Sequence, residues 1–266
     1  MPPGLTVVHL DVDPWELGKN YPAAVAIQGD PKATLPELSE AVRRITGKQG
    51  HPDAVHRTAA VRAAWERERA ALVQRAEAEA ARVPIAPLTL VHELARCAPA
   101  NAAIIDESIS SSQGVRHFFR CADRKSFFGL RGGGIGWGLP AALGVKLALR
   151  DRPVLALVGD GSAMYTNQAL WTAARESLAV VYVIFNNASY RILKQRTRAL
   201  KGFSAEDDRY VGMDLEPLID FVGMARALGV PGERVEKTPE IAPAVERGFA
   251  SGGPYLIDVR IDPSFT

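Results

Sequence analysis

Long apolar runs, paired cysteines and blocks of positive charge are scarce or missing in this sequence of 266 residues. No apolar stretch approaches the roughly 18–20 residues that a membrane-spanning helix needs. The first residues, MPPGLTVVHLDVDP, have no basic region before their apolar run and carry acids within it. They therefore lack the pattern of a signal peptide, and we expect no association with a membrane.

The charge pattern and the cysteines exclude further classes. The formal net charge is only +2, and no run of Lys or Arg alternates with aromatic residues, which argues against a nucleic-acid partner. Cys97 and Cys121 lack the spacing of metal ligands, so we expect reduced thiols in a cytoplasmic protein. A hydrophobic fraction of 47% with 23% charged residues is typical of a soluble globular protein.

From residue 84 onward, short β-branched runs alternate with helical patterns. The continuous apolar character of the runs is typical of parallel strands buried on both faces, which predicts a doubly wound α/β domain over residues 84–266. The predicted strands are 102–106, 153–158, 179–185 and 254–261, and the predicted helices are 88–97, 137–149, 165–177, 217–228 and 239–250.

The N-terminal part has a different texture. Residues 5–10 and 25–28 resemble short strands, and residues 34–45 form an amphipathic helical pattern. These are too few elements for a complete domain, so we expect residues 1–46 to be part of a second α/β domain in which the chain begins. Residues 47–83, rich in Ala, Arg and Glu, predict a helical linker.

Unusual residues stand directly after two of the predicted strands. Gly159-Asp160-Gly161-Ser162 follows PVLALV, and Asn186-Asn187-Ala188-Ser189 follows VVYVIF. In an open parallel sheet, ligands bind beyond the carboxyl ends of the strands. Asp160 and Asn187 are separated by one strand–helix–strand unit, so we expect them to lie side by side on neighbouring strands.

The chemistry of these residues suits a metal ion bound with a diphosphate. A carboxylate, an amide oxygen and a loop carbonyl form the all-oxygen ligand set that Mg²⁺ prefers, with phosphate and water completing the octahedron. Gly159 and Gly161 allow the backbone to approach a ligand closely. A helix beginning near Ser162 would direct its free N–H groups at a phosphate.

Two alternatives compete with this interpretation. Gly-Asp-Gly alone is more often just a turn, so the pairing with the second strand end carries the prediction. Haloacid-dehalogenase-type phosphatases also pair an Asp-x-Asp motif, here HLDVDP at residues 9–14, with a later Gly-Asp-Gly. In that family the first motif continues into Gly-Thr and another acid follows the second. Pro14-Trp15 and SAMYTN stand there instead, which argues against a phosphatase.

The combination GDGSAMY and, some two dozen residues later, NNASY resembles the signature of thiamine-diphosphate enzymes. The stretch FFGLRGGGIGWGLPAALGVKLALRDRPVLALVGDGS resembles the pyrophosphate-binding domain of the 2-oxoacid decarboxylase and acetolactate synthase superfamily, and benzoylformate decarboxylase looks nearest within it. VVHLDVDPWELGKNYPAAVAIQGDPKATLPEL resembles the last part of the central domain of that superfamily. The resemblance therefore implies that residues 1–46 are the C-terminal remnant of a central domain and residues 84–266 a thiamine pyrophosphate-binding domain.

The resemblance also implies roles for individual residues. Asp160, the side chain of Asn187 and the backbone carbonyl of Ser189 would bind Mg²⁺. The other implied cofactor contacts are the close approach at Gly159, the backbone N–H groups of Gly161, Ser162 and Ala163 and the hydroxyl of Tyr165 at the diphosphate, the carbonyl of Gly133 at the aminopyrimidine, and Ile135 beneath the bent cofactor. Ile192 and Arg196 would shape the substrate pocket.

The implied activity is the decarboxylation of a 2-oxo acid that depends on thiamine diphosphate and Mg²⁺. An acetolactate synthase-like carboligase and a non-catalytic cofactor-binding remnant are the alternatives, and the identity of the 2-oxo acid stays open. Family members use a glutamate from a separate pyrimidine-binding domain, and no residue of this chain is assigned a certain catalytic role. We therefore expect a pyrimidine-binding domain from another chain or from a missing N-terminal part, and a homo-oligomer for the full-length enzyme. The start within a central-domain strand favours a fragment over one subunit of a split enzyme.

Overall fold

The computed structural model describes residues 2, 4–47 and 51–265, and the chain divides into two compact units, Met1–Glu66 and Arg67–Thr266. Residues 48–50 of the predicted linker lie outside the described part. The first unit contains β1 (Val8–Asp11) and β2 (Val25–Gln28), which pair in parallel, and α1 (Pro31–Thr46). The helix α2 (Pro52–Ala78) begins in this unit and ends in the second.

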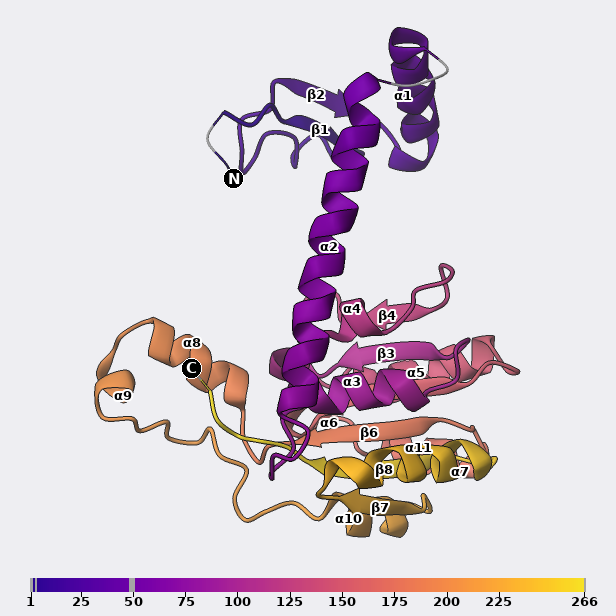
Figure 1. Ribbon diagram of the computed structural model, residues 1–266, viewed down its shortest axis with the longest axis vertical. Helices are drawn as coiled ribbons and strands as arrows, with labels where there is room; N and C mark the ends of the chain where they lie inside the picture. The colour runs from indigo at the N-terminus through magenta and orange to yellow at the C-terminus, as the bar shows by residue number, and fades with distance from the viewer. Residues whose placement is uncertain (1, 3, 48–50, 266) are drawn as a thin grey trace. The chain divides into compact units, whose positions relative to one another are not determined.

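The second unit is built on a six-stranded, wholly parallel sheet with the strand order β4-β3-β5-β6-β8-β7. Figure 1 shows β4 and β3 toward one edge of this sheet and β8 and β7 toward the other. Its strands are β3 (Ala103–Glu107), β4 (Phe127–Gly129), β5 (Val154–Gly159), β6 (Val181–Asn186), β7 (Gly232–Val235) and β8 (Tyr255–Arg260). Its helices are α3 (Pro87–Cys97), α4 (Val115–Phe118), α5 (Gly138–Ala148), α6 (Asp160–Ala163), α7 (Ala169–Arg175), α8 (Arg191–Ala199), α9 (Phe203–Glu206), α10 (Phe221–Ala227) and α11 (Ile241–Ala250), with 3₁₀ turns η1 (Ile109–Ser111) and η2 (Thr238–Glu240).

Both faces of this sheet are covered, which is why its central strands are apolar throughout. Successive side chains of a strand point to opposite faces. Leu155 and Leu157 pack in a cluster with α3 and α11, whereas Ala156 and Val158 pack in a second cluster with α5, α7 and α10. The predicted doubly wound parallel sheet is therefore confirmed.

Two predicted helices begin four residues later than expected. The helix predicted over residues 217–228 is α10 (Phe221–Ala227), and the helix predicted over residues 165–177 is α7 (Ala169–Arg175), which a turn precedes. The hydroxyl of Thr166 donates a hydrogen bond to the carbonyl of Gly136 at 2.7 Å, so this turn is tied to a distant loop. The strands β4 and β7 were not predicted because they are short and carry Gly, Glu and Arg in place of a continuous apolar run.

No helix in the described part of the chain is long and apolar enough to cross a membrane. Both cysteines are free, Cys97 half-buried at the end of α3 and Cys121 exposed.

We expect the two thiols to react at very different rates with iodoacetamide at pH 8. Burial raises the pKa of the Cys97 thiol to about 11, so about one molecule in 1,000 carries the reactive thiolate there. Mass spectrometry of a time course should show Cys121 modified at least ~100-fold faster than Cys97. The variant Cys121→Ser should leave only the slow phase, and two equally fast phases in the parent chain would contradict the burial of Cys97.

Candidate functional site

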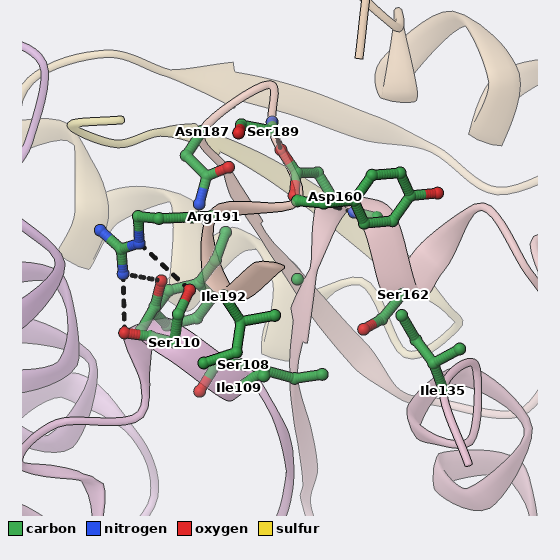
Figure 2. Close-up of a pocket in the computed structure, with 15 residues that line it drawn as sticks. Ser108, Ile109, Ser110, Ile135, Asp160, Ser162, Asn187, Ser189, Arg191 and Ile192 are labelled. Carbon is green, nitrogen blue, oxygen red and sulfur yellow. Dashed lines mark hydrogen bonds between the residues drawn. The ribbon is translucent and has the colours of Figure 1, made fainter. Parts of the chain in front are cut away.

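A small cavity lies where β3, β5 and β6 end, at the carboxyl edge of the sheet (Figure 2). Its volume is about 30 Å³, which is room for a metal ion and one or two water molecules. Eight residues expected to contact cofactor, metal or substrate line this cavity: Ile135, Gly159, Asp160, Gly161, Ser162, Asn187, Ser189 and Ile192. The tertiary structure thus brings together residues from the glycine-rich turn and from two strand ends.

Asp160 and the Asn187 segment are neighbours because β5 and β6 pair directly. The carboxylate of Asp160 accepts a hydrogen bond from the N–H of Gly161 at 2.8 Å and a longer one from the N–H of Ser189 at 3.4 Å. Asp160 is only 2% exposed, and this burial raises the pKa of its carboxyl group to about 6, although backbone N–H groups oppose the rise. In this site the negative charge is therefore costly unless a cation balances it.

Asn187 contributes a buried oxygen to the same cavity. Its side-chain Oδ1 is one of the buried side-chain atoms in the described residues that have no hydrogen-bond partner. Leaving a buried acceptor unpaired costs about 1–3 kcal/mol. Ala188, the next residue, has a left-handed backbone with φ of 55°, which turns the chain between Asn187 and Ser189.

These donors fit a hard divalent cation. In the described part of the chain, no three His, Cys, Asp or Glu side chains gather as a metal-binding cluster. A cation at Asp160 therefore depends on neutral oxygens, and the amide oxygen of Asn187 is unpaired beside it. One carboxylate with neutral oxygens suits Mg²⁺, which takes further ligands from phosphate and water.

The two adjacent asparagines have different tasks. The side chain of Asn186 donates to Asp258 at 2.8 Å and accepts from Arg260 at 2.8 Å and from the N–H of Ala188 at 3.2 Å. Asp258, fully buried in β8, also accepts a hydrogen bond from Arg234 at 3.0 Å. The side chain of Asn186 therefore fixes the loop through its hydrogen bonds, whereas the Oδ1 of Asn187 remains available to a ligand.

Four of the expected residues do not line the cavity. Gly133 lies exposed in the glycine-rich turn, and Arg196 lies farther along α8. The side chain of Ala163 packs in the core, and Tyr165, 56% exposed, packs against Gly136. The helix expected near Ser162, whose free N–H groups were to face a phosphate, is α6 and starts at Asp160. The N–H of Gly161, one of these groups, donates to the carboxylate of Asp160 instead.

The sequence reasoning missed the segment of residues 108–111, which forms the opposite wall of the cavity. Ile109 has φ of 48°, a strained conformation for a β-branched residue. Arg191, buried at the start of α8, holds this segment through hydrogen bonds to the carbonyl of Ser110 at 2.7 Å and to the hydroxyl of Ser111 at 2.8 Å (Figure 2). The signal was present, because ESISSS follows a predicted strand just as the other two motifs do.

Gly161 is needed for the close packing of this site. A Cβ atom at this position would lie 2.5 Å from the Tyr190 ring, so Gly161→Ala should force the ring to move and lower the free energy of unfolding by about 1–3 kcal/mol. Urea denaturation measures this loss. Gly144→Ala is the matched control, because it lies inside α5 with no atom near its Cβ position and should stabilise the chain by about 0.5–1 kcal/mol. Equal effects of the two variants would contradict the packing argument.

The comparisons with known proteins agree with this geometry. Residues 108–259 match the family model described as thiamine pyrophosphate enzyme, C-terminal TPP binding domain. The chain belongs to this family. The matched residues include both strand-end motifs and the 108–111 wall, so the resemblance inferred from GDGSAMY and NNASY is confirmed.

Relatives of two kinds are found. Benzoylformate decarboxylase of Pseudomonas aeruginosa is 31% identical over 259 residues, covering 97% of this chain and 44% of that protein. The acetolactate synthase large subunit of Parasynechococcus marenigrum is 31% identical over 266 residues, covering 97% of this chain and 40% of that protein. Among solved structures, the thiamine diphosphate-dependent 4-hydroxybenzoylformate decarboxylase of Rhodococcus jostii RHA1 is similar with a TM-score of 0.76 and 29% identity, covering 99% of this chain and 46% of that one. The chain spans less than half the length of each of these relatives.

Proposed function

We propose that this chain holds the diphosphate of thiamine diphosphate through Mg²⁺, and that it does so in an enzyme that decarboxylates a 2-oxo acid. The observation that carries the first part is that the buried carboxylate of Asp160 and the unpaired Oδ1 of Asn187 line the same cavity. Together with the backbone carbonyl of Ser189 they would hold the metal. When bound, the cofactor supplies a nucleophilic carbon and an electron sink for cleavage next to a carbonyl group.

The chain's own residues would bind and orient in this proposal. Ser162 and the 108–111 wall also line the cavity, where N–H and hydroxyl groups can donate hydrogen bonds to the oxygens of a diphosphate. Gly133 and Ile135, in the glycine-rich turn, would contact the aminopyrimidine part. Ile192 lines the cavity on the α8 side and, with Arg196 beyond it, would shape the space for the 2-oxo acid.

Two partners complete the proposal. A pyrimidine-binding domain, from another chain or from a longer form of this one, would supply the glutamate that activates the cofactor, and the complete enzyme would be a homo-oligomer. The cavity is a small recess at the edge of the sheet, so a second surface would supply further contacts to a bound cofactor.

Decarboxylation is supported by the likeness to benzoylformate decarboxylase and to the 4-hydroxybenzoylformate decarboxylase structure. Carboligation of the acetolactate synthase kind is the second candidate, since the acetolactate synthase large subunit of Parasynechococcus marenigrum and benzoylformate decarboxylase have the same sequence identity to this chain, 31%. The two share the same anchor for the cofactor.

Isothermal titration of the full chain tests the anchor. Inorganic diphosphate should bind in the presence of Mg²⁺ and fail to bind with EDTA, and thiamine diphosphate should behave in the same way. Addition of a pyrimidine-binding domain with benzoylformate and pyruvate then tests the reaction. Benzaldehyde and CO₂ would support decarboxylation, whereas acetolactate would favour the second candidate. The absence of any Mg²⁺-dependent binding would refute the anchor itself.

A further inference from the structure

A buried carboxylate outside the lining of the cavity stands next to the proposed cofactor site. Glu107 is the last residue of β3 and is only 1% exposed. Its carboxylate accepts three hydrogen bonds, from the backbone N–H groups of Gly136 at 2.7 Å, Trp137 at 3.1 Å and Gly138. All three come from consecutive residues, about thirty positions away in the sequence, at the end of the glycine-rich loop and the start of α5. The side chain therefore ties the central sheet directly to that loop.

The position of these N–H groups explains why a carboxylate stands there. Gly138 is the first residue of α5, and the first N–H groups of a helix have no partner within it. A negative charge at this end of a helix is favourable. Hydrogen bonds from several N–H groups also offset the cost of burying the carboxylate. A Cβ atom at Gly138 would lie 2.8 Å from an oxygen of Glu107, so the contact needs glycine at this point.

The loop that Glu107 holds would otherwise have wide freedom. Gly132 and Gly133 have φ of 73°, and Gly136 has φ of 92°, a region that glycine visits easily. Two further contacts hold Gly136, the hydrogen bond from the hydroxyl of Thr166 to its carbonyl and the packing of Tyr165 against its Cα. The loop is thus fastened at one end, immediately after Ile135.

Ile135 is the residue through which this loop lines the cavity. Its neighbour Gly136 provides the first of the three amides bound by Glu107, so the position of Ile135 relative to Asp160 depends on that carboxylate. We propose that Glu107 is a positioning residue, which sets the glycine-rich turn for the thiamine part of the cofactor without touching the ligand. This inference rests on the proposed function, because it assigns the turn to the thiamine part and the Asp160 side to the diphosphate.

The full chain with Glu107→Gln tests this role. The amide of Gln has an NH₂ group in place of one carboxylate oxygen, and this group would face backbone N–H groups that need an acceptor. Hydrogen exchange at residues 136–138 should therefore accelerate at least ~10-fold. With Mg²⁺ present, affinity for thiamine diphosphate should fall about tenfold, while affinity for inorganic diphosphate stays within about twofold. A parallel fall for both ligands, or unchanged affinity for both despite faster exchange, would overturn the inference.

A second variant keeps the test valid if Glu107→Gln does not fold. Thr166→Val removes the other hydrogen bond to Gly136 and should lower the affinity for thiamine diphosphate about threefold relative to inorganic diphosphate. An unchanged ratio of the two affinities would show that the contacts holding Gly136 do not set the glycine-rich turn, which would overturn the inference. Glu176→Gln, on the exposed end of α7, is the control and should change neither affinity. If the parent chain binds neither ligand, the proposed function falls and this inference falls with it, whereas a failed ratio in a chain that binds both overturns only the role of Glu107.

Discussion

Asp160→Asn is expected to weaken the binding of Mg²⁺ with inorganic diphosphate on the order of 100-fold or more. Asp160 is the one carboxylate among the described residues that line the cavity, and an amide offers a divalent cation one neutral oxygen in place of a charged pair. Titration calorimetry of the full chain with Mg²⁺ and diphosphate measures this loss.

The same variant should make the metal-free chain more stable. Burial raises the pKa of the Asp160 carboxyl group to about 6, so at pH 7.5 the folded chain carries a charge that its surroundings disfavour. Removing that charge should raise the free energy of unfolding by about 1–2 kcal/mol, after the loss of one weak hydrogen bond from Ser189. Urea denaturation without Mg²⁺ measures this gain.

The opposite signs of these two effects make the test sharp. A residue that served only the fold would lose stability when replaced, and it would not lose affinity in a chain that became more stable. Asp151→Asn, on an exposed turn, is the matched control and should change neither quantity. Retained binding with Asp160→Asn would refute the assignment of the metal site.

The second large effect is expected at Asp258, which lies fully buried in β8 and does not line the cavity. Asp258→Ala removes the acceptor for Asn186 at 2.8 Å and for Arg234 at 3.0 Å. Breaking a buried charged network by removing one partner costs about 3–5 kcal/mol. Since the side chain of Arg234 is 42% exposed and can turn to water, we expect a loss near the lower limit, about 3 kcal/mol, in urea denaturation.

Asp258→Ala should also loosen the loop that carries Asn187. Asn186 holds the N–H of Ala188 through its Oδ1, and without Asp258 its own side chain loses one of its ties. We expect the affinity for Mg²⁺ and diphosphate to fall about tenfold, a typical effect of a residue that supports metal ligands. A surface substitution, Asp151→Ala, should change stability by less than about 0.5 kcal/mol. Unchanged affinity in a destabilised Asp258→Ala chain would show that Asn186 does not depend on Asp258.

Several features of the site were predictable because they are local. The pattern of an apolar run followed by Gly-Asp-Gly predicts a buried strand that ends at an acid, and the structure ends β5 at Gly159 directly before Asp160. The spacing to Asn187 predicted neighbouring strands, and β5 and β6 are neighbours. The identities of Gly159 and Gly161 pointed to close approach, and at Gly161 the Tyr190 ring fills the space of a side chain.

Other features were not predictable because they depend on contacts between distant segments. The helix predicted over residues 165–177 begins only at Ala169, because residues 164–168 form a turn, and propensity could not show the hydrogen bond from Thr166 to Gly136 that holds this turn. The two asparagines after β6 look alike in the sequence. Only the position of Asp258 in β8 ties the side chain of Asn186 to the sheet, and the Oδ1 of Asn187 has no partner among the described residues.

By itself, the sequence determined the doubly wound sheet and the place of the site, because apolar periodicity decides burial and parallel strands all end at one edge. It also pointed to the chemistry of a magnesium-bound diphosphate through residue types that suit hard cations. The tertiary structure alone decided which oxygens are left unpaired and which carboxylates hold the loops. Those roles follow from hydrogen bonds between residues 24 to 81 positions apart, such as Arg234 with Asp258, Glu107 with Gly136 and Arg191 with Ser110, and no local pattern encodes them.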